Sequence, residues 1–454
     1  MSTYRTNEST KGDYAGARFK TDPEEIRLVR KLDTWIMPTL WLMYFLNYID
    51  RGSLAQARLN HLERDLNMHG ENFNTAVSIL NVGYILMQVP SNMLLTRVRP
   101  SAYLSVVMFI WSAIAACTGL VRSYGALIFW PGACYILASF YTRKELAARL
   151  AIMHSAALTG IGLVNLVAVR IFSDLGGARG VEGWRWMYFI EGTASAFMAA
   201  CSFWLLPNTP ETTRWLNARE GQLAAERIRR DRLDEAKDTD SVWTAFRQAA
   251  TDKRTWLFCL MAHITNVPLN FVYFLPTIIS DLGYGDTKAL LLACPPYLCA
   301  ALASIAVACS SGWFHERTWH LTAGLALEVT GFVAAAATMN PTGRYVACFI
   351  FPAGGYMIPP LIISWMAATL SQSPEKKAVA LAMLNVSVTM GYIYGPYLWP
   401  SSDGPRYMIG FGVSAAYCVA GMVVCWAMRV LLRRENVRIK RDVGAGSVIN
   451  LYGY

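Results

Sequence analysis

Apolar runs of about twenty residues, bounded by charged or turn-forming residues, recur along the whole chain of 454 residues. A helix needs about 20 apolar residues to cross a bilayer core, and no alternating strand pattern accompanies these runs. Since only helices then satisfy the backbone, the pattern predicts an all-α polytopic membrane protein. Twelve membrane spans are expected, over residues 35–57, 75–95, 101–121, 125–141, 150–171, 185–206, 255–280, 287–311, 318–338, 345–369, 378–399 and 406–430.

A long polar stretch separates the sixth apolar run from the seventh and divides the chain into two halves of six spans each. The first 34 residues are polar and charged, so no cleavable signal peptide is expected. We predict cytosolic tails and a cytosolic central loop around the two six-helix halves. The five parts in chain order are residues 1–34, 35–206, 207–254, 255–430 and 431–454.

The fourth apolar run, 125–141, reads GALIFWPGACYILASFY and is short. Its 17 residues extend roughly 25 Å at about 1.5 Å of rise per residue, whereas a bilayer core is roughly 30 Å thick. If this run crosses, 31 of the 41 Lys and Arg residues lie on the cytosolic side; if it does not, 15 do and 26 lie outside. Basic residues gather in cytosolic loops, so we predict an unusually short fourth helix that still crosses.

Composition narrows the class further. The chain is 54% hydrophobic and 16% charged, whereas soluble proteins carry roughly a quarter charged residues. The net charge of +10 comes from basic residues in alternate loops and tails, which argues against nucleic acid. The ten cysteines fall mostly inside apolar runs without a CxxC pair, so no metal site or disulfide framework is expected. No phosphate-binding loop, HExxH or GxSxG occurs, so we expect no enzyme, no cofactor and no nucleotide-driven motor.

Several local motifs carry a family resemblance over about residues 35–435. The first half contains LNYIDRGSLAQARL, GYILMQVPSNMLLTRVRPS, SFYTRKELAARLAIMHSA, GWRWMYFIEG and LLPNTPETTRWL. The second half contains YFLPTIISDLGY, PPY at 295–297, ERTWHLT at 316–322, KKAVALAMLN and GPRYMIGFG. Together they resemble the fungal anion:cation symporters of the major facilitator superfamily, and in particular the allantoate permease branch.

The resemblance implies a major facilitator fold with 12 transmembrane helices arranged as 6+6 and with cytosolic N- and C-termini. It also implies a secondary transporter that moves a small organic anion or vitamin-like metabolite together with protons by alternating access. The expected partners are a small anionic substrate, protons and the lipid bilayer. We expect a monomer in the plasma membrane.

Three departures from the family pattern each remove a polar group. About a dozen residues that precede FWPGA in the family, including an arginine and an acidic residue, are absent before Phe129. In the loop between spans eight and nine, the family's SDR motif is replaced by residues 310–313, which contain no aspartate. In span ten, the family's asparagine pair is replaced by Ala367 and Ala368. An exporter of a fungal secondary metabolite, a nutrient receptor that does not transport, and a defective chain therefore stay open as alternatives.

Candidate site residues in the first half are polar groups inside predicted spans, where they are costly and tend to face a cavity or a partner. Asp50 and Arg51 in span one form either a gate that attracts an anion or a local structural pair near the outer surface. Arg170 in span five either receives a carboxylate from the substrate or extends to the membrane interface. His154 and Asn165 share that span, and an imidazole suits proton coupling because it titrates near neutral pH.

In the second half, His263, Asn266, Asn270 and Tyr273 recur at spacings of three and four, which places them on one helical face of span seven. Such a stripe lines a water-filled cavity or makes hydrogen bonds between helices. Further binding contacts are expected from Trp365, Asn385 and Tyr392. Two intramembrane carboxyl groups, Glu191 and Glu328, are interpreted mainly as structural, the second through pairing with a neighbouring helix.

Overall fold

The computed structural model describes residues 23–95, 100–124, 127, 146–207, 213, 215–217, 219–223, 242–314, 316–370, 374–442 and 453. These ranges form helices and contain no strand. The first half consists of α1 (Pro23–Leu59), α2 (Leu62–Asp65), α3 (Asn72–Leu95), α4 (Pro100–Thr118), α6 (Leu146–Leu175), the 3₁₀ helix η3 (Ala178–Gly180) and α7 (Gly183–Leu205).

The second half begins with α9 (Val242–Thr251), α10 (Lys253–Asn266), the 3₁₀ helix η4 (Pro268–Tyr273) and α11 (Leu275–Ser280). It continues with α12 (Asp286–Phe314), α13 (Thr318–Ala337), α14 (Pro341–Gly355) and α15 (Ile358–Thr369). It ends with α16 (Pro374–Tyr394), the 3₁₀ helices η5 (Gly395–Leu398) and η6 (Ser401–Asp403), and α17 (Met408–Asp442).

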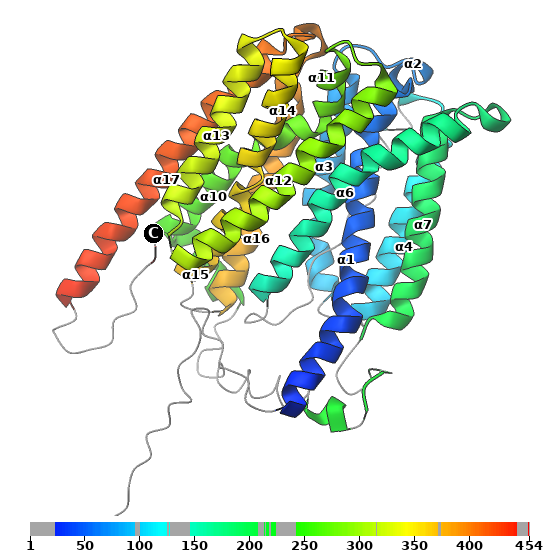
Figure 1. The fold of residues 1–454 in the computed structure, drawn as a ribbon. Coiled ribbons are helices and arrows are strands. Elements are labelled where there is room, and N and C mark those ends of the chain that lie inside the picture. The colour runs from blue at the N-terminus through cyan, green and yellow to red at the C-terminus, as the bar shows by residue number, and fades with distance from the viewer. Residues whose placement is uncertain are drawn as a thin grey trace, which may run out of the picture.

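The helices form two bundles that lie side by side (Figure 1). In the first bundle α1 packs against α6 and α7, and α4 packs along α7. In the second, α13 packs against α14 and α17, and α10 packs against α16 and α17. The bundles meet where α6 lies along α12 and where α3 contacts α16, so these two helix pairs form the boundary between the halves.

Seven helical stretches among the described residues are long and apolar enough to cross a membrane. They cover Ser101–Thr118, Lys253–Tyr273, Asp286–Phe314, Thr318–Ala337, Pro341–Thr369, Lys376–Leu398 and Met408–Ile439. Helices α1, α3, α6 and α7 coincide with four more of the expected spans, although polar residues such as Asp50 and Glu191 lower the hydropathy of α1 and α7. The total of twelve spans and the side on which the termini lie stay predictions.

The boundaries differ from the sequence prediction at several places. Helix α1 begins at Pro23, and α17 continues to Asp442, so parts of both predicted tails are helical. The fourth apolar run, 125–141, lies outside the described residues apart from Leu127, and its predicted crossing and short length stay predictions. Residues 1–22, most of the central loop between 208 and 241, and 443–452 also lie outside.

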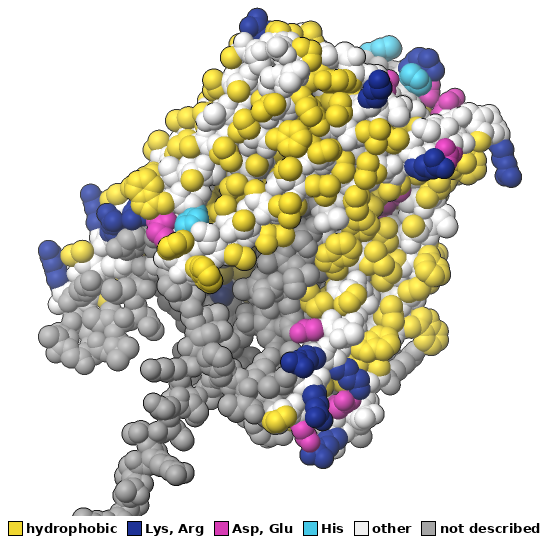
Figure 2. All heavy atoms as spheres, viewed as in Figure 1, with side chains coloured by type: hydrophobic (Ala, Val, Ile, Leu, Met, Phe, Trp, Pro, Cys, Tyr) yellow, Lys and Arg dark blue, Asp and Glu magenta, His cyan; other side chains and the backbone are white. Residues whose placement is uncertain are grey.

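On the face shown in Figure 2, hydrophobic side chains cover most of the described surface of both bundles. Phe109, Phe197, Leu302 and Val423 each expose more than half of their side-chain surface and come from four different helices. The charged side chains in the same view gather toward the two ends of the molecule. An apolar belt between polar ends is the surface that a bilayer requires.

Small residues allow the closest helix contacts. A Cβ atom on Gly192 of α7 would lie 2.7 Å from the backbone nitrogen of Ala116 on α4, and one on Gly331 of α13 would lie 2.5 Å from that of Phe351 on α14. Contacts of this kind are typical of membrane helices, which gain their association from close packing. The small residues therefore determine the spacing of α4 and α7 and of α13 and α14.

Outside the apolar part of the second bundle, a carboxylate joins three helices. Asp252 caps α10 by accepting a hydrogen bond from the backbone N–H of Arg254 at 2.9 Å, and the Arg254 guanidinium also binds it at 2.9 Å. Lys376 of α16 lies 2.6 Å from the same carboxylate, and Arg254 reaches Glu435 of α17 at 3.2 Å. Burial alone would raise the pKa of Asp252, but the hydrogen bonds from Arg254 and Lys376 outweigh it and lower the pKa from 3.8 to about 2.

We expect Asp252→Asn to destabilise the purified protein at neutral pH by about 1 to 2 kcal/mol, because the amide still caps α10 but loses the charge that binds Lys376 and Arg254. The folded pKa is depressed, so this contribution is complete above the ordinary value of 3.8 and disappears as the pH falls through about 2. Thermal unfolding of the two chains measures the difference.

The matched control for this prediction is Asp174→Asn, which removes an exposed ion pair with Arg170 whose side chains are 45% and 82% exposed. Exposed pairs contribute little, so this variant should unfold close to the wild-type temperature. Equal effects of the two substitutions would contradict the assignment of stability to the Asp252 network.

Candidate functional site

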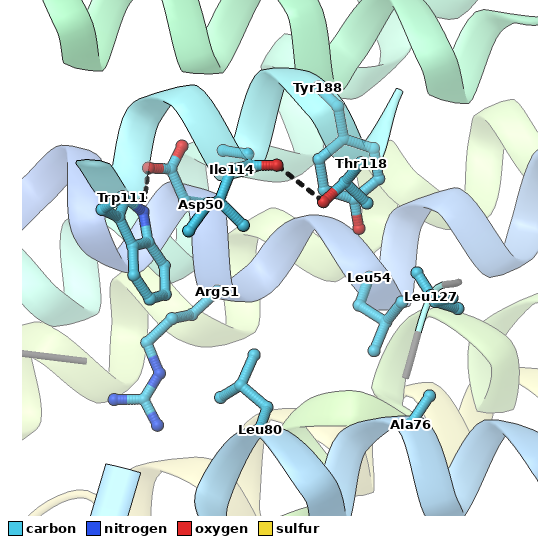
Figure 3. A pocket seen from close by; sticks show the side chains of 11 residues that line it. Asp50, Arg51, Leu54, Ala76, Leu80, Trp111, Ile114, Thr118, Leu127 and Tyr188 are labelled. Carbon is cyan, nitrogen blue, oxygen red and sulfur yellow. Dashed lines mark hydrogen bonds between the residues drawn. The ribbon is translucent and has the colours of Figure 1, made fainter. Parts of the chain in front are cut away.

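A pocket that is open on one side lies inside the first bundle (Figure 3). It is lined by Asp50, Arg51 and Leu54 of α1, Ala76 and Leu80 of α3, Trp111, Ile114, Ala115 and Thr118 of α4, and Leu127 and Tyr188. Most of these side chains are apolar, and Asp50 and Arg51 contribute the charges. A largely apolar cavity with a few convergent polar groups is the usual form of a small-molecule site.

Asp50 is 8% exposed and occupies one wall of this pocket. Its Oδ2 atom accepts a hydrogen bond from the indole N–H of Trp111 at 2.6 Å and one from the hydroxyl of Ser195 at 3.1 Å. Its Oδ1 atom is buried and has no hydrogen-bond partner in the part of the chain that the structure describes. The carboxyl group is therefore oriented by two neutral donors, both of which bind the same oxygen.

Arg51 extends away from Asp50, although the two residues are adjacent in sequence (Figure 3). Its guanidinium donates to the side-chain oxygen of Asn81 on α3 at 3.3 Å and lies 5.7 Å from the ring centre of Tyr48. Successive residues of a helix project in different directions, so neighbours in sequence do not face each other. The structure thus separates the two charges that the sequence analysis also considered as a local pair, and places both in the pocket wall.

The boundary between the bundles is closed at the end of the molecule where α1 finishes and α3 begins (Figure 1). Three hydrogen bonds join α3 to α16 and η5 there: Thr75 with the Tyr397 hydroxyl at 2.9 Å, Ser78 to the Ile393 carbonyl at 2.6 Å, and Asn81 to the Tyr392 carbonyl at 3.5 Å. Because Asn81 also binds Arg51, the pocket is connected to the second bundle through one side chain.

Span seven is discontinuous in the second bundle. Helix α10 ends at Asn266, and the chain continues as η4 from Pro268, whose ring removes a backbone donor. Asn270 in this segment is fully buried and donates to the carbonyls of Val267 at 2.8 Å and Gly391 of α16 at 3.3 Å. Its side-chain oxygen has no partner among the described residues. Discontinuous helices of this kind commonly mark binding sites in transporters.

His263 connects three helices of the second bundle. Its Nδ1 lies 2.7 Å from the carbonyl of Ser387 on α16, which can accept but not donate, so Nδ1 carries the proton. The Nε2 atom lies 2.8 Å from the Tyr394 hydroxyl, and the hydroxyl groups of Tyr394 and Tyr417, on α17, are 3.4 Å apart. The arrangement supports the interpretation of His263 as a residue that makes hydrogen bonds between helices.

The other first-half candidates lie apart from the pocket or cannot be placed. Asn165 is fully buried and accepts from Gln56 of α1 at 3.0 Å, so it joins α6 to α1. Arg170 is 82% exposed and pairs with Asp174 at 2.9 Å, which favours the interfacial alternative over substrate binding. His154 belongs to α6, but its side chain lies outside what the structure describes.

The remaining second-half candidates are spread over the bundle. Asn266 is buried and donates to the carbonyl of Ala262 at 2.8 Å, while Tyr273 packs edge to face with Tyr392 at 6.5 Å. Trp365 is 1% exposed and donates to the carbonyl of Gly453 at 3.0 Å. Asn385 is exposed on α16. The structure therefore joins Tyr273 and Tyr392 but does not bring Trp365 or Asn385 to the first-half pocket.

Sequence reasoning missed the residues that surround the charges of the pocket. Trp111 donates to Asp50, Asn81 and Tyr48 lie against Arg51, and Tyr188 lines the same pocket beside Thr118 (Figure 3). Their aromatic and amide side chains are common in membrane helices, so nothing in their spacing distinguishes them. Asn81 could have been singled out as a polar residue in the middle of span two.

Two departures from the family pattern can be followed in the structure. Glu316 supplies a carboxylate near the missing aspartate, where it pairs with Arg429 of α17 at 2.6 Å and accepts from the backbone N–H of Trp319 at 2.9 Å. Ala367 and Ala368 lie in α15 and offer no polar group. The segment before Phe129 lies outside the described residues.

Glu328 of α13 is fully buried, and neither of its carboxyl oxygens has a hydrogen-bond partner among the described residues. A Cβ atom on Gly355 would lie 2.7 Å from its Oε1, which shows how closely the carboxyl group meets the junction of α14 and α15. The thiol of Cys418 on α17 interacts with this carboxyl group, so the expected pairing with a neighbouring helix is made by a weak sulfur donor.

Comparisons with known proteins agree on one family. A sequence model described as Major Facilitator Superfamily matches residues 40–396. The transporter cnsO of Penicillium expansum is 29% identical, over 91% of this chain and 84% of its own length. The transporter hxnP of Emericella nidulans is also 29% identical, over 93% of this chain and 88% of its own length.

Among solved structures, the chain resembles the proton:xylose symporter XylE bound to 6-bromo-6-deoxy-D-glucose, with a TM-score of 0.65 and 14% identity. The match covers 87% of this chain and 96% of that protein. At this identity the likeness concerns the fold alone.

The tight contact between Asn270 and η5 gives a test of the site geometry. A Cβ atom on Gly395 would lie 2.1 Å from the Asn270 side-chain nitrogen. Gly395→Ala should displace Asn270 from its two carbonyls and lower the stability by about 1–3 kcal/mol. Combined with Asn270→Ala, which makes room, the same substitution should add little, as a double-mutant cycle in thermal unfolding measures.

Gly412→Ala is the control for this cycle, because nothing lies within 4 Å of a Cβ atom there. It should leave the unfolding temperature unchanged or raise it slightly. Strictly additive effects of Gly395→Ala and Asn270→Ala would show that the two residues do not meet as described.

Proposed function

We propose that this chain, which belongs to the major facilitator superfamily, moves a small organic anion across the membrane together with protons. The family and its relatives are transporters and not enzymes, so the chain is a multi-pass membrane transporter, and the expectation that it is no enzyme is confirmed. Proton coupling, the anionic substrate, the twelve spans with cytosolic ends and the plasma membrane belong to the proposal.

One observation carries the proposal: Asp50 and Arg51 reach the same pocket from adjacent positions of α1 but point in different directions. A guanidinium inside the bilayer region offers an anion a charged, bidentate donor. A buried carboxyl group with one oxygen that no described residue binds offers a place for a proton. The pocket thus holds a site for each of the two transported species.

The boundary between the bundles supports alternating access. The pocket is linked through Arg51 and Asn81 to the carbonyl of Tyr392 in the second bundle, at the end that is closed in this structure. An anion that binds Arg51 competes with Asn81 for the guanidinium and so acts on a contact that joins the halves. Proton-driven transport by the symporter XylE, which shares the fold, is in keeping with this reading.

The direct test is flux in proteoliposomes. With the purified chain reconstituted, labelled monocarboxylates and dicarboxylates should accumulate on the alkaline side of an imposed pH gradient, and neutral amide analogues should not. A protonophore should abolish the accumulation. Both directions of flux are measured, which distinguishes uptake from the alternative of export.

A matched pair of arginine variants sharpens this test. Arg51→Gln should lower anion transport by about tenfold or more, because a charged contact in a dry pocket is lost. Arg170→Gln should have little effect, since Arg170 is exposed and paired with Asp174. Binding of an anion without flux would replace the proposal by the receptor alternative, and flux that ignores the pH gradient would refute proton coupling.

A further inference from the structure

A second carboxyl group, Glu191 of α7, faces Asp50 across the contact between α1 and α7. It is 3% exposed. The two helices exchange polar groups reciprocally: Ser195 of α7 donates to Asp50 of α1 at 3.1 Å, and the hydroxyl of Ser53 on α1 lies 2.5 Å from Oε2 of Glu191. Neither carboxyl group forms an ion pair with a described residue, and each has one oxygen that no described residue contacts through a hydrogen bond.

The surroundings of this pair hold little charge. From α7, Tyr188 is close enough to interact electrostatically with both carboxyl groups, and from α1, Arg51 is directed toward Asn81. Helix α4 carries no charged residue over its whole length and contributes Trp111, with Tyr103 and Cys117 as its other titratable groups. The packed part of α6, residues 156–169, and the start of α3, residues 72–83, contain no charged residue.

The fourth apolar run supplies no cation to the pair of carboxyl groups, because residues 123–142 contain no Lys, Arg or His. Two unpaired negative charges side by side in an apolar interior are strongly unfavourable. One of the two groups must therefore carry a proton in this state.

The hydrogen-bond partners indicate which of the two carboxyl groups carries the proton. Asp50 Oδ2 receives two bonds, from Trp111, which can donate but not accept, and from Ser195. Two donors on one oxygen are suited to an anion. Ser53 also lies 2.8 Å from the carbonyl of Ile49, which can accept but not donate. A hydroxyl has one proton, so when Ser53 donates to Ile49, the hydrogen of the short contact must come from Glu191.

We propose that Glu191 holds a resident proton and donates it in a hydrogen bond to Ser53, so that the pair carries one negative charge, on Asp50. Glu191 is then a positioning residue. Its neutral carboxyl group keeps α1 and α7 together, and it leaves Asp50 as the single group of the pair that exchanges a proton with the pocket. This role rests on the proposed function where it concerns coupling, but the protonation of Glu191 does not.

Infrared difference spectroscopy on the purified full chain in lipid at neutral pH tests the protonation directly. The difference between wild type and Glu191→Gln should show the carbonyl band of a protonated carboxyl group. The difference between wild type and Asp50→Asn, the matched control on the opposite helix, should show the two bands of an ionised carboxylate. Carboxylate bands for Glu191 would overturn the proposal whatever the protein transports.

Transport supplies the second readout. Gln is nearly isosteric with a protonated Glu and can donate to Ser53, so Glu191→Gln should keep accumulation driven by the pH gradient within about twofold of wild type. Loss of this accumulation, with exchange between labelled and unlabelled substrate retained, would show that Glu191 releases its proton in each cycle and would overturn the resident role.

If Glu191→Gln does not yield folded protein, Ser53→Ala gives an independent measurement. Removing the acceptor should move the protonated carboxyl band to the higher frequency of an acid without a hydrogen bond. A band that stays in place would contradict the bond from Glu191 to Ser53.

Discussion

The constraint on which the site depends is the placement of Asp50 and Arg51 at adjacent positions of one buried helix. Successive residues of an α-helix project about 100° apart, so the carboxyl group and the guanidinium reach different neighbours. Asp50 is held by Trp111 and Ser195, and Arg51 by Asn81. If the two had paired, each would neutralise the other. Because they do not, the pocket wall carries one acidic and one basic group that point in different directions.

This separation connects the pocket to the movement that transport needs. Arg51 reaches the second bundle through Asn81 and the carbonyl of Tyr392, and further hydrogen bonds from α3 to α16 close the same end. These contacts must break before the pocket can open there. The break between α10 and η4, and the junction between α14 and α15, place irregular backbone in the second bundle, where helices can bend at low cost.

The sequence predicts most of the fold because apolar length is a local property. Every expected span except the fourth coincides with described helices, and Pro268 signals the break in span seven. The direction of a side chain is not a local property. Arg51 and Arg170 look alike as basic residues inside apolar runs, yet one lines the pocket and the other is exposed beside Asp174.

Contacts between helices that are distant in sequence could not be predicted from the sequence either. The sequence alone does not identify Ser53 as the partner of Glu191, because the two residues lie 138 positions apart. The same holds for Gln56 and Asn165, which join α1 to α6. Such pairs depend on how the helices pack, which a single sequence does not record.

The central claim is that Asp50 carries the proton while Arg51 holds the anion. Comparing exchange with accumulation in Asp50→Asn tests it most directly. In proteoliposomes without a pH gradient, this variant should exchange labelled for unlabelled anion near the wild-type rate, because Arg51 is untouched. With an inside-alkaline gradient it should accumulate no anion above equilibrium. Accumulation equal to that of the wild type would contradict the account.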